Sequence, residues 1–183
     1  GKPVGLVLSG EDTEIDRSVG LANTLVVLTA DHGSLPLVET LQAKGVDARR
    51  ESPQVLLTAV QNALSKRFPG VGGLIAYFAT DIYLDEAVIR RRTLDRQDVE
   101  RTAIDALMAT GLVEHVYTQS DLLNGNNPAD PHLKLFQNAF FQARSPHLSV
   151  LTKQYVYLST LPGGTGHGTA WDYDRHVPIV FMG

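Results

Sequence analysis

The sequence predicts an α/β fold in which a partial parallel-sheet core carries an inserted small α+β subdomain. Two apolar runs, 4–8 and 24–29, are bounded by Gly and Asx residues, as the buried strands of parallel sheets are. A third run, 177–182, has its proline near the start, where a strand tolerates one. Between these runs, segments with helical and strand periods alternate, which favours a separate α+β layer.

The middle stretch opens with a predicted amphipathic helix over 53–68. Ser52 and Pro53 form an N-cap and first-turn pair, and apolar residues follow at helical spacing as far as Phe68. The glycines at 70–73 end this helix, and a strand or hairpin arm is expected over 74–84.

The remaining middle elements repeat the alternation, and Gly111 is expected to cap one of the helices. They are a helix, a strand, a turn cluster, a helix and a strand, at 96–109, 113–117, 124–128, 131–143 and 147–158. We therefore divide the chain into a partial core with a first metal motif, an inserted subdomain, and a core return with a second metal motif and the last strand. These units cover residues 1–50, 51–160 and 161–183.

Composition excludes several classes of function. The chain has 183 residues, of which 43% are apolar, and its 16 Lys and Arg against 20 Asp and Glu give a formal net charge of −4. The basic residues are scattered apart from a run at 90–92, so we expect no nucleic-acid footprint. No apolar stretch reaches the roughly 20 residues of a membrane span. With no cysteine, any metal falls to His, Asp and Glu.

The first candidate site directly follows the second expected strand, as Thr-Ala-Asp31-His32-Gly33. Ligands bind beyond the carboxyl ends of strands in open parallel sheets, and an adjacent carboxylate and imidazole suit a cation such as zinc. The alternative is a turn in which Asp31 only caps the next segment. Residue type and position leave both interpretations open.

The second candidate site is the glycine-dense segment 162–178, with His167 among four glycines. Such a backbone can approach a ligand closely, although the pattern is neither a P-loop nor a dinucleotide fingerprint. The alternative is a flexible hairpin tip with an exposed histidine.

Other histidines are assigned to structure, and two aspartates are candidates for orienting histidines. The histidines are His115, His132, His147 and His176, the last expected in the core, and the aspartates are Asp172 and Asp174. The sequence contains no Gly-x-Ser-x-Gly elbow and no His-Glu-x-x-His, which excludes those hydrolase classes.

Taken together, the two motifs resemble the alkaline phosphatase superfamily. The resemblance is carried by Leu-Thr-Ala-Asp31-His32-Gly, by Gly-Thr-Gly-His167-Gly-Thr and by Tyr-Asp-Arg-His176-Val-Pro-Ile-Val-Phe-Met-Gly. It is nearest to phosphate-irrepressible alkaline phosphatases and type I phosphodiesterase/nucleotide pyrophosphatases, and it extends over most of the chain.

The resemblance implies a zinc-dependent hydrolase of small-molecule phosphoric esters, monoester or diester, with two Zn²⁺ per complete enzyme and a phospho-Thr or phospho-Ser intermediate. Asp31 and His32 would then bind the zinc that activates the nucleophile, and His167 the other zinc. Relatives are commonly exported, which implies a periplasmic or secreted location. Oligomeric state and physiological substrate stay open.

The sequence also departs from this family. The nucleophile is expected outside the chain, and the run at 4–8 is followed by Asp12 and Asp16 but by no histidine ligand. We therefore expect a C-terminal portion of a larger enzyme, with segments missing around 9–21, weak zinc binding and negligible turnover by these residues alone. The alternative function is a non-catalytic α/β binding module that retains a degenerate metal site.

Overall fold

The structure is a computed structural model that describes residues 17–20 and 23–182. The strand expected at 4–8, together with Asp12 and Asp16, lies outside the described residues.

A four-stranded antiparallel sheet forms the centre of the body, with strand order β3-β4-β6-β5. A hairpin turn at Thr80 joins β3 to β4, so the strand or hairpin expected over 74–84 is a hairpin. Leu148, paired with Ile82 of β4, and Leu151 are almost wholly buried. The strands are β3 (Ile75–Ala79), β4 (Asp81–Leu84), β5 (Val113–Thr118) and β6 (Leu148–Thr152).

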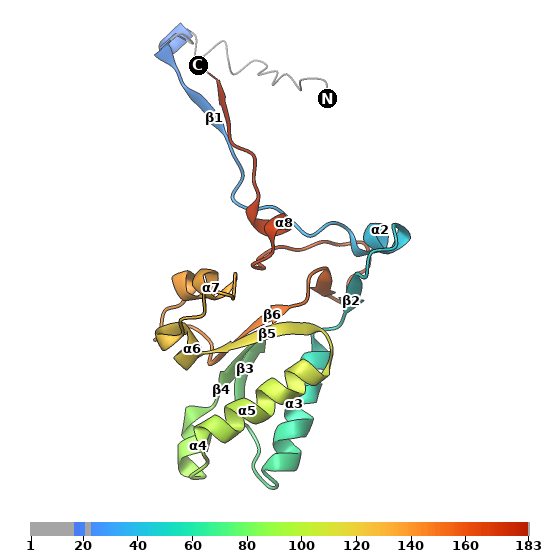
Figure 1. Cartoon of the computed structure of the whole chain (residues 1–183), viewed down its shortest axis with the longest axis vertical. Helices are drawn as coiled ribbons and strands as arrows, with labels where there is room; N and C mark the ends of the chain where they lie inside the picture. Colours follow the sequence, from blue (N-terminus) through green and yellow to red (C-terminus); the bar gives the residue numbers. More distant parts are fainter. Residues whose placement is uncertain (1–16, 21–22, 183) are drawn as a thin grey trace.

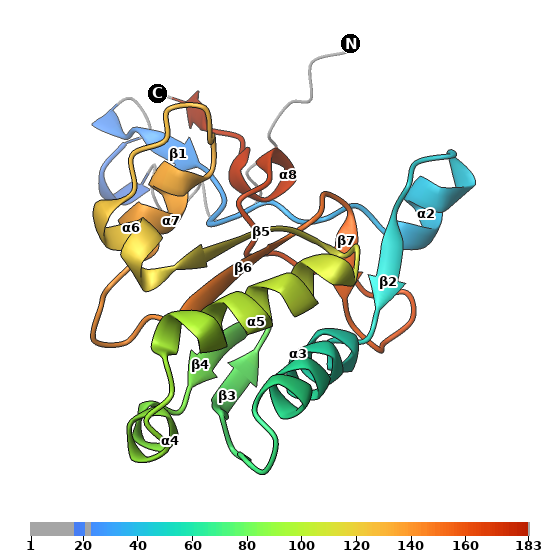
Figure 2. The same ribbon diagram turned by 60° about the horizontal axis from the view of Figure 1, so that its bottom comes forward.

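Two long helices, α3 (Gln54–Arg67) and α5 (Arg96–Ala109), lie side by side on one face of this sheet (Figure 2). Helix α3 begins one residue later than expected, with Pro53 as its N-cap, although Ser52 Oγ still accepts the Gln54 N–H at 3.2 Å. Gly111 follows the end of α5 with a positive φ of 71°, as the sequence predicts. Their inward faces form one buried apolar cluster with the strands, and the members from these two helices are Leu56, Val60, Leu64, Val99, Ala103 and Leu107. This cluster is the main core.

Shorter helices connect the strands, and most of them lack a long apolar period in the sequence. They are α4 (Glu86–Arg91), α6 (Gln119–Asn124) and α7 (Leu133–Ala139). Helix α6 begins with a capping box between Thr118 and Asp121, a local signal that the sequence contains. Helix α7 is shorter than the 131–143 expected, because Phe140 already has extended backbone geometry.

A second small sheet links the body to the site. Strand β2 (Arg49–Glu51) pairs in parallel with β7 (Val156–Leu158), and α2 (Val38–Ala43) precedes it. The single strand expected over 147–158 was wrong, because a turn at 153–155, in which Tyr155 has a φ of 63°, separates β6 from β7.

A two-stranded ribbon projects from the body (Figure 1), where β1 (Val26–Leu28) pairs with β8 (Val180–Met182). The pairing is antiparallel and the side chains are largely exposed, with Phe181 66% accessible. The prediction that these apolar runs are buried strands of a parallel sheet is wrong for the residues described. The runs have strand propensity, but no described helix covers them.

Parallel pairing at β2–β7, antiparallel pairing elsewhere and helices packed on the central sheet confirm the predicted α/β class. The division at residues 51 and 161 stays a prediction. Across the described ranges, no helix combines the length and hydrophobicity required to cross a membrane.

Candidate metal centre

Two imidazole rings from distant parts of the chain lie face to face. The rings of His32 and His167 have centroids 3.6 Å apart and planes inclined by 13°. His32 follows β1, whereas His167 lies in the loop before α8 (Asp172–Arg175). The two motifs singled out in the sequence therefore meet at one place in the structure.

Asp31 and His32 are arranged as two ligands of one cation would be. His32 Nε2 lies 3.6 Å from Asp31 Oδ2, and two ligands of a tetrahedral zinc at 2.0–2.2 Å are roughly 3.4 Å apart. His32 Nδ1 lies 2.6 Å from the Gly33 carbonyl oxygen, which can accept the ring N–H and leave Nε2 free. The Asp31 side chain is 88% exposed, so the donor set is open to an ion. These donors fit zinc.

Stacking restricts how the two histidines could share metal ions. The lone pair of an imidazole nitrogen lies in the ring plane, so nitrogens of two stacked rings do not converge on one ion. They can serve two neighbouring ions, since two-metal sites have separations of about 3.5–4 Å. Among the described residues, no three His, Asp or Glu side chains are grouped to hold one ion.

Backbone hydrogen bonds hold the two loops together. The Gly33 N–H donates to the Asp174 carbonyl at 2.8 Å, the Leu35 N–H donates to the Gly166 carbonyl at 2.9 Å, and the Thr165 hydroxyl donates to the Leu35 carbonyl. Gly33 also passes so close to the Tyr173 carbonyl oxygen that a Cβ would overlap it. Glycine at position 33 is therefore required by this contact.

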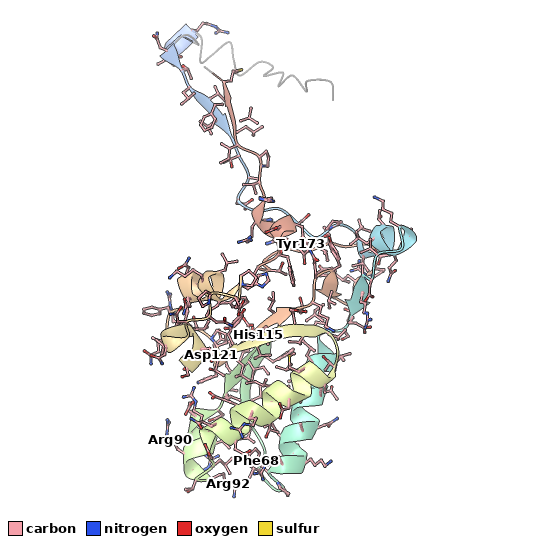
Figure 3. The ribbon with its side chains drawn as sticks, viewed as in Figure 1. Phe68, Arg90, Arg92, His115, Asp121 and Tyr173 are labelled. Atoms are coloured by element: carbon pink, nitrogen blue, oxygen red, sulfur yellow. The ribbon has the colours of Figure 1, made fainter. Side chains whose placement is uncertain are left out.

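Asp174 shapes the loop that follows His167. Its Oδ2 accepts the Thr169 N–H at 2.7 Å and the Thr169 hydroxyl at 2.6 Å, and only 5% of the residue is exposed. Next to it, burial raises the pKa of the Tyr173 phenol, and Figure 3 places Tyr173 at the junction of ribbon and body. Asp174 thus fixes the loop through Thr169 rather than by holding a histidine, which corrects its expected role.

Arg50 is a site residue that the sequence motifs do not reveal. Its guanidinium donates to the carbonyls of Leu161 and Gly164 at 2.9 and 2.7 Å and pairs with both carboxylate oxygens of Glu39. This pairing holds the pKa of Glu39 below its usual value. The partners stand 111 and 114 residues away, so no local pattern could identify the contact.

The other histidines and Asp172 make their contacts with residues outside the candidate metal centre. His147 is structural as predicted, because its Nδ1 accepts the Leu84 N–H at 3.0 Å. His132 contacts Trp171 edge-on, and His115 packs on Tyr117. The side chain of His176 is exposed, so its expected core position is wrong. Asp172 pairs with Arg175 at 2.6 Å instead of orienting a histidine.

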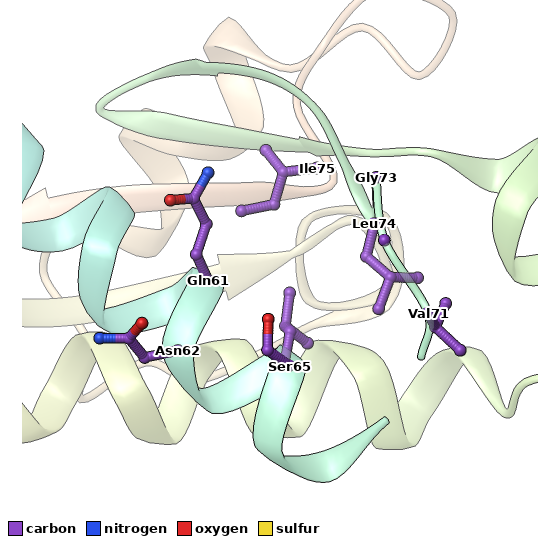
Figure 4. A pocket seen from close by; sticks show the side chains of 9 residues that line it. Gln61, Asn62, Ser65, Val71, Gly73, Leu74 and Ile75 are labelled. Atoms are coloured by element: carbon purple, nitrogen blue, oxygen red, sulfur yellow. The ribbon is translucent and has the colours of Figure 1, made fainter. Parts of the chain in front are cut away.

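A hollow of ≈ 370 Å³ between α3 and the 71–75 segment (Figure 4) differs chemically from the candidate metal centre. Gln61, Asn62 and Ser65 provide its polar side chains, and none of the described residues lining it is ionisable. It therefore offers no group for metal binding or proton transfer.

Fold and loops together define the class of protein: an α/β chain in which a carboxylate and two imidazoles gather where two loops join. The structure superposes on wild-type alkaline phosphatase PafA with a TM-score of 0.80 and 25% identity, over 93% of this chain and 32% of that one. No family model matches.

Sequence relatives agree with the structural comparison. Alkaline phosphatase PhoD of Zymomonas mobilis is 31% identical over 190 residues, covering 95% of this chain and 33% of that protein. Alkaline phosphatase PafA of Elizabethkingia meningoseptica is 27% identical, covering 92% and 31%, and PhoK of Sphingomonas sp is 29% identical, covering 86% and 30%. The chain belongs to the alkaline phosphatase superfamily, and it spans about a third of the length of these relatives.

Proposed function

We propose that this chain is the part of a zinc-dependent phosphoric-ester hydrolase that supplies ligands to two adjoining metal positions. The observation that carries the proposal is the stacking of His32 on His167 beside the exposed Asp31 carboxylate. The names of the relatives support a phosphatase, and both monoester and diester substrates fit the resemblance.

In this proposal Asp31 and His32 bind one zinc ion, and His167 binds the second. Bound zinc would supply Lewis acidity towards phosphoryl oxygens and lower the pKa of a coordinated hydroxyl group. The Gly33 carbonyl holds His32 in the tautomer that leaves Nε2 available. The Asp174 side chain fixes the second loop through Thr169, the Asp174 backbone carbonyl accepts the Gly33 N–H of the first loop, and Arg50 anchors the second loop at the Gly164 carbonyl. A Thr or Ser outside residues 1–183 would act as the nucleophile, and we infer a periplasmic or secreted location from the resemblance.

The test uses the protein expressed from its complete reading frame. We expect hydrolysis of phenyl phosphate, diphenyl phosphate or both, abolished by chelation and restored by zinc. His32→Ala and His167→Ala should each lower kcat/KM at least about 100-fold, because each removes a metal ligand. His115→Ala, an exposed imidazole on the sheet, should stay within about twofold of the parent. Hydrolysis that persists after chelation, or that both ligand variants retain, would refute the proposal.

A degenerate metal site in a non-catalytic binding module is the second candidate. It is favoured by the lack of a three-ligand group among the described side chains. It predicts that the same protein binds zinc through Asp31 and His32, measured by calorimetry, yet hydrolyses neither ester. The activity assay above therefore separates the two functions.

A further inference from the structure

A cleft of ≈ 320 Å³ opens directly beside His167. It lies between the β3–β4 turn, strands β6 and β7 and the loop that follows His167. Its lining includes Asp81, Phe136, Leu151, Tyr157, Leu158 and His167. His167 is part of both the candidate metal centre and the cleft lining. A group bound at the metal positions would therefore lie next to the cleft.

One part of the cleft wall is apolar and suits a flat ring, and the rest of the wall is polar. Phe136 and Tyr157 contribute aromatic rings, and Leu151 and Leu158 contribute aliphatic side chains. The Tyr157 ring is fixed, because its hydroxyl donates to the Thr165 carbonyl at 3.0 Å and Arg50 lies over its face at 5.1 Å. An aromatic ring gains more from such preformed apolar walls than a small alkyl group does.

A single acidic group, Asp81, also lines this cleft. Its Oδ1 accepts the Val150 N–H at 2.7 Å, and within the described residues this is the one hydrogen bond of the carboxyl group. A carboxylate has room for about four donors, so acceptor capacity is left over. The preceding Thr80 has a φ of 77°, which is rare for a β-branched residue and typical of strain kept at functional sites.

We infer that this cleft binds the leaving group of the phosphate ester and favours an aromatic ring that carries a hydrogen-bond donor, which Asp81 accepts. The inference rests on the proposed function, since it takes the phosphoryl group to lie at His32 and His167. Burial raises the pKa of Asp81, and a donor from the ligand would return part of the solvation that the carboxylate has lost.

The first experiment measures binding without activity. The protein expressed from its complete reading frame is titrated with 3-aminophenol and with phenol, and the methyl signals of Leu151 and Leu158 are followed by NMR. Trp171 is a second reporter, because its indole N–H donates to the carbonyl of the cleft residue Thr152 at 3.0 Å. We expect 3-aminophenol to bind about tenfold more tightly than phenol. Its amine can donate to Asp81 while its hydroxyl takes the position of the ester oxygen beside His167, whereas the single hydroxyl of phenol can occupy only one of the two places.

Two variants and one control sharpen the binding experiment. Asp81→Asn keeps an acceptor for the Val150 N–H but directs an amide donor to the ligand, so it should abolish the preference for 3-aminophenol. Phe136→Leu should weaken both ligands by about threefold, because it removes an aromatic contact. Gln61→Ala, in the hollow of Figure 4, should change neither. Methyl shifts that are absent, or a preference that survives Asp81→Asn, would overturn the inference.

The second experiment separates this inference from the proposed function. In the protein from the complete reading frame, we compare kcat/KM for 3-aminophenyl phosphate and methyl phosphate. Asp81→Asn should lower the ratio of kcat/KM for 3-aminophenyl phosphate to kcat/KM for methyl phosphate about tenfold. The kcat/KM for methyl phosphate itself should stay within about twofold of the parent value. If no ester is hydrolysed while 3-aminophenol still binds at Asp81, the proposed function and the leaving-group role are both refuted. The cleft would then remain a binding site for aromatic amines. If hydrolysis persists with an unchanged ratio, the leaving-group role alone fails.

Discussion

The helix-covered sheet and the loops that carry Asp31, His32 and His167 are held together by different kinds of interaction. In the first region, α3 and α5 bury apolar side chains such as Leu56 and Val99 completely. In the second, backbone hydrogen bonds join short segments with little regular structure, and one glycine is required by a close contact. The buried core contributes most to the free energy of unfolding, whereas the loop contacts contribute less to it and fix the positions of the ligand side chains. Substitutions should therefore separate stability from ligand geometry.

Leu56→Ala should have the largest effect on stability and little effect on the metal centre. Leu56 is fully buried in α3, so truncation should lower the free energy of unfolding by about 2–5 kcal/mol. Urea unfolding followed by circular dichroism measures this loss, and Val55→Ala on the exposed side of the helix should stay within about 0.5 kcal/mol. A large loss of zinc affinity in folded Leu56→Ala would contradict the separation of the two regions.

Gly33→Ala should show the reverse pattern. A Cβ at this position overlaps the Tyr173 carbonyl oxygen, so the loops must separate. We expect zinc affinity, measured by calorimetry, to fall at least about tenfold, or about 1.4 kcal/mol, with a smaller change in unfolding free energy. Gly72→Ala is the matched control, because its new methyl group would meet no atom within 4 Å and its φ is not left-handed. Equal affinities in the two variants would show that the loop contact does not position the ligands.

Arg50→Met tests the anchor of the glycine-dense loop. The change removes hydrogen bonds to the Leu161 and Gly164 carbonyls, and we expect zinc affinity to fall about three- to tenfold. Amide hydrogen exchange over 161–168 should accelerate in the same variant. Arg49→Met, which loses only an exposed pair with Asp47, should change neither quantity. Unchanged exchange in Arg50→Met would refute the anchoring role.

His147 should produce a small pH dependence of stability in the packed region. Burial is the main cause that lowers the pKa of His147, and repulsion by the Arg96 charge is the second. Nδ1 of His147 must be unprotonated to accept the Leu84 N–H. Because the unfolded state takes up the proton more readily, stability is full above the usual value of 6.5 and is lost as pH falls below it. We expect a loss under about 1 kcal/mol between pH 7 and 5, abolished by His147→Gln. A loss of equal size in His147→Gln would assign it to other groups.

The sequence predicts the packed region better than the site because the signals differ in range. The period of 53–68, Ser52 before it and Gly111 after α5 are local patterns, and the helices appear where they predict. The Asp31-His32 and His167 motifs could be recognised for the same reason. The role of Arg50 could not be recognised, because its carbonyl partners are more than a hundred residues away in the chain. No local pattern distinguishes Arg50 from the other Lys and Arg residues of the sequence.

Strand pairing was the other limit of the sequence. Apolar runs at 24–29 and 177–182 indicate strands, but neither their direction nor their burial is encoded in composition. The structure gives an exposed antiparallel pair instead of a covered parallel sheet. Similarly, the alternation over 147–158 carries no sign that the backbone turns at Tyr155. These outcomes depend on which distant segments are available to pair.

The ribbon of β1 and β8 has a practical consequence for handling residues 1–183. Val27, Ile179 and Phe181 are 47%, 60% and 66% exposed on this narrow projecting ribbon. Within the described residues this two-stranded ribbon has two unpaired edges, and apolar edges favour the addition of strands from other molecules. Concentrated samples should therefore form oligomers that dissociate on dilution, and a charged residue in place of Phe181 should suppress them.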